Sequence, residues 1–134
     1  MTGVQTCALP IWISRLTPQE SYCVCLAACT THLAADAFDE VFTLSTAFLL
    51  GGASTVLGSL WRMKDAGTAV LMFLVHHYLS RGARPVDALH RAQMWMLNPD
   101  RRIPESMPAP MRDILPGLNL TDPVVWAGLT HQGH

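Results

Sequence analysis

Apolar residues occur along this chain in two patterns, short continuous runs and longer stretches with helical spacing. The continuous runs YCVCLAA (Tyr22 to Ala28) and STVLGSLW (Ser54 to Trp61) are bounded by polar residues and have the length of buried β-strands. Between them, apolar residues from Phe38 to Leu49 recur at i, i+3 and i+4, after a predicted N-cap at Asp36 and before a turn at Gly51-Gly52. This order predicts two parallel strands joined by a helical crossover.

The next part of the chain predicts two further helices. One is capped by Asp65 and ends at Ser80-Arg81-Gly82. The other has Pro85 as its first residue and stops at Asn98-Pro99. Their expected buried stripes are Val70, Phe73, Leu74 and His77 in the first helix, and Val86, Leu89, Gln93 and Met96 in the second.

A proline-rich segment separates these helices from the end of the chain. Prolines recur between Pro99 and Pro123, so we expect an irregular excursion there. The run PVVWAGL, from Pro123 to Leu129, is a candidate last strand. The whole order of elements predicts an α/β fold with a mostly parallel sheet.

Composition excludes several classes of protein. The 134 residues carry nine Lys and Arg against ten Asp and Glu, a net charge of −1, which argues against binding to nucleic acid or to an anionic membrane surface. Hydrophobic residues make up 50% and charged residues 14%, below the roughly 25% of an average domain, so the chain is expected to fold. The longest apolar run, Ala66 to Leu79, is shorter than the roughly 18 residues that a membrane-spanning helix needs. We expect one modest domain without a transmembrane segment.

The four cysteines point to a reducing compartment. No cationic and apolar export signal opens the chain, so we expect free thiols and a cytoplasmic location. Cys23, Cys25 and Cys29 form a C-x-C-x3-C pattern, but no further Cys/His pair completes four ligands at zinc-like spacing. Cys23 and Cys25 are therefore expected in the core of a strand, and neither a metal nor a cofactor is expected.

The first eleven residues, MTGVQTCALPI, differ from the rest. They have no charge and no periodicity, and they are similar to the translation of a common sequencing adapter. We expect this segment, with Cys7, to be non-native, and the native sequence to begin at about Trp12. The true gene is then expected to start further upstream.

The candidate reactive residues follow the two predicted parallel strands, because reactive residues in such sheets lie just beyond the carboxyl ends of the strands. Cys29 with Thr30 and Thr31 follows the first strand, and Trp61 to Asp65 follows the second. A simpler interpretation is that Cys29 is a small buried thiol. Asp36 and Asp65 suit helix caps more readily than a specificity pocket for a basic side chain.

Several segments between residues 22 and 130 follow one known pattern in order. They are Leu26 to Thr31, Asp39-Glu40 with Ala47 to Leu49 and Gly51 to Ala53, Val56 to Trp61 with Asp65, Ala88-Leu89 with Ala92-Gln93, and Trp126-Ala127. Together they resemble the C-terminal half of a CHAT domain, a caspase-like fold of the cysteine-peptidase class often found in prokaryotes alongside tetratricopeptide repeats. The resemblance implies part of a three-layer caspase-like fold over residues 12–134, with helices on both faces of the sheet.

The resemblance also implies a function. Cys29 would be the nucleophile, activated by a histidine on a neighbouring strand upstream, because a free thiol with a pKa of about 8.5 is mostly protonated at neutral pH. Backbone N–H groups near the cysteine would hold the oxyanion. Thr30, Trp61 and Asp65 are then the expected substrate-binding residues, and the substrate is a protein or peptide.

The histidines of this chain do not fit the role of the base. All of them follow Cys29: His32, His76, His77, His90, His131 and His134. In caspases the histidine lies roughly 50 residues upstream of the cysteine, and His32, in the loop just after Cys29, would have to fold back. His76 and His77 point about 100° apart on a helix, and His77 is expected to pack on a helix face. We therefore expect a truncated gene product whose catalytic histidine lies upstream of Trp12, and an inactive fragment.

Two alternatives remain. The chain can be an inactive caspase-like scaffold or protein-interaction domain in which Cys29 is only structural. It can also be a redox or metal module built on Cys23, Cys25 and Cys29, which would bind zinc. The resemblance to CHAT domains also implies upstream tetratricopeptide repeats as a candidate partner in the full-length protein.

Overall fold

The computed structural model describes residues 23–26, 37–61 and 65–134. The chain divides into two compact units. One contains the chain up to Trp61 together with Leu129–His134, and the other contains Arg62–Gly128. We call them the sheet unit and the helical unit.

The sheet unit is built on three strands in the order β1 (Cys23–Leu26), β2 (Thr55–Ser59) and β3 (Leu129–Gly133). β1 runs parallel to β2, and β3 runs antiparallel to it. The α/β class is therefore confirmed, with an antiparallel strand added beside the parallel pair, as is common in mixed sheets. All of β2 is buried, which explains why its sequence reads as one continuous apolar run.

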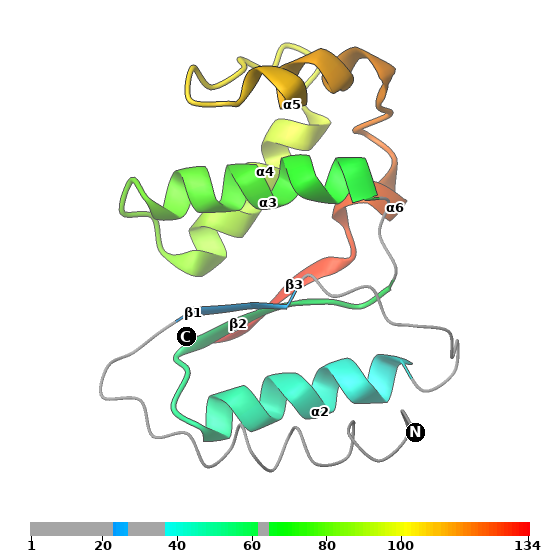
Figure 1. The fold of residues 1–134 in the computed structure, drawn as a ribbon. Helices are drawn as coiled ribbons and strands as arrows, with labels where there is room; N and C mark the ends of the chain where they lie inside the picture. Colours follow the sequence, from blue (N-terminus) through cyan, green and yellow to red (C-terminus); the bar gives the residue numbers. More distant parts are fainter. Residues whose placement is uncertain (1–22, 27–36, 62–64) are drawn as a thin grey trace. The chain divides into compact units, whose positions relative to one another are not determined.

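The helix α2 (Ala37–Leu50) connects the two parallel strands and lies along one face of the sheet, in contact with β2 (Figure 1). Gly52 adopts a φ of +99°, which turns the chain from α2 back toward β2. The prediction of a helical crossover between parallel strands is confirmed. Ala47 of this helix and Leu57 of β2 are among the buried apolar residues of the unit.

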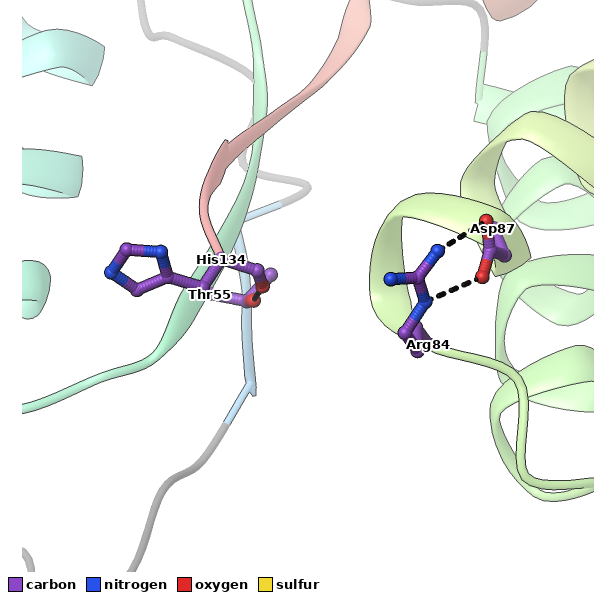
Figure 2. A network of polar contacts seen from close by, with 4 residues as sticks. All are labelled: Thr55, Arg84, Asp87 and His134. Carbon is purple, nitrogen blue, oxygen red and sulfur yellow. Dashed lines mark hydrogen bonds and ion pairs between the residues drawn. The ribbon is translucent and has the colours of Figure 1, made fainter.

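The conformation at the end of β3 requires a glycine at position 133. Its φ is +104°, and the space that a Cβ would need is filled by the carbonyl oxygen of Ser54 and the side chain of Leu49. The following residue, His134, donates its backbone N–H to the same Ser54 oxygen at 2.9 Å. The Thr55 hydroxyl donates to the His134 carbonyl oxygen at 2.6 Å, a contact drawn in Figure 2. The last residue is thus held at the beginning of β2.

The helical unit contains α3 (Asp65–Leu79), α4 (Pro85–Leu97), α5 (Ala109–Ile114), the 3-10 turn η1 (Leu115–Gly117) and α6 (Pro123–Trp126). α3 packs against both α4 and α6. The fully buried side chains of this unit include Val70, Leu71, Leu74, Val75, Ala88, Ala92, Met96, Met107 and Leu120.

The close approach of α3 and α6 requires a glycine. A Cβ on Gly67 would overlap the Val125 side chain, which is buried on α6. The α6 backbone is tied to α4 as well, because the Gln93 side-chain amide donates to the Trp126 carbonyl oxygen at 3.3 Å.

The helix α4 begins and ends where the sequence predicts. Pro85 is in the first turn, where it removes no helical hydrogen bond, and the helix ends before Asn98. Just before α4, the Arg84 guanidinium pairs with the Asp87 carboxylate at 2.8 Å, also drawn in Figure 2. Both side chains are largely exposed, so this pair contributes little to stability.

Three sequence-based expectations need correction. Pro123–Trp126 is helical and the last strand begins only at Leu129, because the Asp122 carboxylate accepts from the Val124 N–H at 3.0 Å and caps a helical turn with Pro123 in it. The proline-rich excursion contains the short elements α5 and η1. On α4, Val86 is 39% exposed instead of buried.

Candidate functional site

The carboxyl ends of the two parallel strands meet at one edge of the sheet. Leu26, the last residue of β1, pairs with Gly58, the residue before the end of β2. Cys29 and Thr30 follow β1 in the sequence and lie outside the described residues. In the sequence, Cys29 comes three residues after Leu26, and reactive residues of such sheets follow the carboxyl ends of parallel strands.

Trp61 belongs to the same edge, after β2. The Ser59 hydroxyl, on a residue that is buried, donates to the Trp61 carbonyl oxygen at 2.5 Å. A hydroxyl that binds the backbone two residues ahead closes a local turn, so the chain direction after β2 is fixed. The Trp61 side chain is 41% exposed. The role of this exposed ring in substrate binding stays a prediction.

Asp65 belongs to the helical unit, where it is the first residue of α3. A negative charge in the first turn of a helix is stabilised by the helix dipole. Its position in the chain therefore agrees with the helix-start interpretation, while its role in substrate binding stays a prediction.

Cys23 and Cys25 are unsuited to nucleophilic chemistry. Both are half-buried free thiols of β1, and they lie on the same face of the strand. Burial, followed by the proximity of Cys25, raises the pKa of Cys23 to about 11. Burial also raises the pKa of Cys25. Because only the thiolate attacks carbonyl carbon or binds a metal well, neither thiol is active at neutral pH.

The two described histidines of the sheet unit, His131 and His134, do not lie at the carboxyl edge, and His32 lies outside the described residues. His134 is held at the opposite end, beside Ser54 and Thr55 at the beginning of β2. His131 lies in the middle of β3 and pairs with Leu57, which in turn pairs with Cys25. Its Nε2 atom is buried and has no hydrogen-bond partner in the described part of the sheet unit. His131 therefore belongs to the interior of the sheet.

The remaining described histidines are in the helical unit. His76 is exposed on α3, and His77 is half-buried and stacks against Phe73 with ring centroids 6.0 Å apart. The packing interpretation of His77 agrees with this stacking. Its Nδ1 atom also contacts the Ser106 hydroxyl at 2.9 Å, which the sequence analysis missed. The two residues are separated by a helix and a loop, so no local pattern could have revealed the contact.

A family model for the CHAT domain matches residues 13–134, nearly the whole chain. The chain belongs to the CHAT-domain family. This family is related to the caspase-like cysteine peptidases, so the resemblance seen in the sequence is confirmed. No curated protein and no solved structure matches the chain.

Within this CHAT domain, Ser59 is the residue near the candidate site that the sequence analysis did not single out. A serine at the end of a buried strand, two residues before an exposed tryptophan, is a signal for a local side-chain turn. None of the helices in residues 37–50 and 65–134 is long and apolar enough to cross a membrane. Over the same described residues, no three His, Cys, Asp or Glu side chains gather as a metal site.

Proposed function

We propose that this CHAT domain is the C-terminal part of a cysteine endopeptidase and that Cys29 is its nucleophile. The observation that carries the proposal is the family match over residues 13–134, combined with the place of Cys29 three residues after a strand that runs parallel to its neighbour. Reactive residues of such sheets follow the carboxyl ends of parallel strands.

The proposed reaction is acyl transfer to sulfur. A histidine takes the proton of the Cys29 thiol, and the thiolate attacks the carbonyl carbon of the scissile peptide bond. The C–N bond breaks as the imidazolium returns the proton to the leaving amine. Water then hydrolyses the thioester, which releases the carboxylic acid and restores the thiol.

The properties of β1 support Cys29 as the reactive thiol over its neighbours. Cys23 and Cys25 lie within the strand, and burial raises the pKa of both. A thiol inside a strand stays protonated and packed, whereas Cys29 comes after the strand in the sequence, as reactive residues of such sheets do.

We propose that the base comes from outside this chain. No histidine precedes Cys29 in the sequence, and His131 and His134 lie in the middle of β3 and beside the start of β2. We propose that a segment of the full protein upstream of Trp12 carries the histidine. The chain alone is then inactive.

Substrate contacts are proposed on both sides of the nucleophile. Thr30 follows Cys29 directly, and Trp61 offers an exposed ring at the end of β2. Asp65 would attract a basic side chain of the substrate. The substrate class is a protein or peptide.

The position of the histidines also favours a second candidate function. A domain without a histidine before its cysteine can serve as a caspase-like scaffold that binds other proteins, with Cys29 only structural. The two candidates differ in whether the full-length protein cleaves peptide bonds.

The test is to recover the complete gene and assay its product on a mixture of peptides. The peptidase proposal predicts a His-Gly pair some tens of residues before Trp12, cleavage by the wild type, and no cleavage after Cys29→Ala. The matched control is Cys25→Ala, which removes a thiol that stays protonated and should retain activity. Absence of the upstream histidine, or cleavage that survives Cys29→Ala, would overturn the proposal.

A further inference from the structure

The helical unit carries a cavity, lined by apolar and basic side-chain surface, that the proposed peptidase chemistry does not use. It has a volume of about 420 Å³ and lies where the end of α3 meets the loop before α5. Its lining consists of Phe73, His76, His77, Ser80, Arg81 and Ser106. The ionisable side chains in this lining are all basic. Such a lining favours an anionic ligand.

Ser106 and His77 form a hydrogen-bonded pair in this cavity, with 2.9 Å between Oγ and Nδ1. The His77 ring is held on both sides, by stacking on Phe73 and by an edge contact with Tyr78 at a centroid distance of 5.3 Å. When His77 donates its Nδ1–H to Ser106, the hydroxyl keeps its own proton for a ligand oxygen. The pair can therefore present a hydrogen-bond donor to an anion.

The loop that carries Ser106 is held in place by hydrogen bonds from the Arg112 side chain. The Arg112 side chain donates to the carbonyl oxygen of Met107 at 2.7 Å and also to that of Glu105. The Met107 side chain is buried, and its N–H donates to the Pro104 oxygen at 3.0 Å. The carbonyl groups on both sides of Ser106 are thus engaged and do not repel an anion beside its hydroxyl.

At the end of α3, backbone carbonyl oxygens that could repel an anion already accept hydrogen bonds. Carbonyl oxygens at a helix C-terminus carry partial negative charge, but here they have partners. The Ser80 N–H and hydroxyl donate to the oxygens of His76 and His77, both at 2.9 Å, and the Arg81 N–H donates to that of Tyr78 at 3.1 Å. Among the described residues, the Arg81 guanidinium has neither a hydrogen bond nor an ion pair. Its charge is available to a ligand in the cavity.

We propose that this cavity binds the phosphoryl group of a phosphate monoester. Arg81 supplies positive charge from the end of α3, the His76 ring can donate a hydrogen bond, and Ser106 donates another from the facing loop. Donors that approach from two elements suit a tetrahedral anion, and a phosphate dianion gains more from the basic lining than a carboxylate does. Phe73 adds apolar surface, so an aryl phosphate should bind more tightly than inorganic phosphate.

Isothermal titration calorimetry of the 134-residue chain with phenyl phosphate, inorganic phosphate and acetate tests the proposal. We expect saturable binding of both phosphates, tighter for phenyl phosphate, and weaker binding of acetate. Arg81→Gln and Ser106→Ala should each weaken phenyl phosphate binding about tenfold, the loss expected for one charge-assisted hydrogen bond. Arg81→Lys keeps the charge and should fall between the wild type and Arg81→Gln.

The matched control is Arg91→Gln, because Arg91 lines a different cavity of the same unit, beside Tyr78 and Trp95. It should bind phenyl phosphate like the wild type. No saturable binding, acetate binding as tight as phosphate, or an equal loss in Arg91→Gln would overturn the proposal. Cys29→Ala should leave phosphate binding unchanged, so this test is separate from that of the peptidase function.

Discussion

The buried hydroxyl of Ser59 donates a hydrogen bond to the carbonyl oxygen of Trp61 at the carboxyl end of β2. This contact holds Trp61, whose ring is exposed, just after β2, and β2 ends beside Leu26, the last residue of β1. The candidate site thus depends on a hydrogen bond between two residues of a single turn.

Ser59→Ala should destabilise the chain by about 1 kcal/mol, because a buried hydrogen bond is lost. It should also change the fluorescence of Trp61, whose surroundings depend on the turn. Urea denaturation followed by fluorescence measures both. The control is Ser80→Ala, which removes an exposed hydroxyl bond to the His77 oxygen and should have a smaller effect. Equal losses in the two variants would contradict the role of Ser59.

Gly67→Ala should destabilise the helical unit by about 1–3 kcal/mol, since its Cβ would overlap the Val125 side chain. Val125→Ala makes room for that Cβ, so the double variant should be more stable than the sum of the single effects predicts. Gly117→Ala is the control, because no atom outside the neighbouring residues lies within 4 Å of its Cβ position. Thermal unfolding of the four variants measures the coupling, and strict additivity would contradict the close approach of α3 and α6.

Because the pKa of the Cys23 thiol in β1 is raised, the free energy of unfolding should fall in alkaline solution. Burial raises the pKa of Cys23 from 9.0 to about 11, so between these values the unfolded chain releases a proton that the folded chain keeps. The free energy of unfolding should therefore be independent of this group below pH 9 and should fall as the pH rises through about 11. Urea denaturation at pH 8 and pH 10.5 measures the change. Cys23→Ala should show a smaller fall, and an equal fall would show that other groups cause it.

The sequence predicted the elements that depend on local signals. The strands β1 and β2 follow from continuous apolar runs, and α4 follows from Pro85 at its start and Asn98-Pro99 at its end. The last strand, β3, was misplaced. The residues Val124 and Val125 favour a strand, but the Asp122 cap and Pro123 start a helical turn instead.

The elements that depend on distant residues could not be predicted. β3 (LTHQG) is rich in polar residues, and it is a strand because each of its residues pairs with a residue of β2 that lies 70 or more positions earlier. The contact between His77 and Ser106 joins a helix to a loop 29 residues later. For the candidate site, the sequence placed Trp61 after a strand, but its exposure and its link to Ser59 needed the structure.

The central claim is that the sulfur of Cys29 is the reactive group of this CHAT domain. Treatment of the full-length protein with a peptide chloromethyl ketone, followed by mass spectrometry of its tryptic peptides, tests this claim most directly. The account predicts one adduct, on Cys29, with Cys23 and Cys25 unmodified because burial raises their pKa values. An unmodified Cys29, or an adduct on the cysteines of β1 instead, would contradict it.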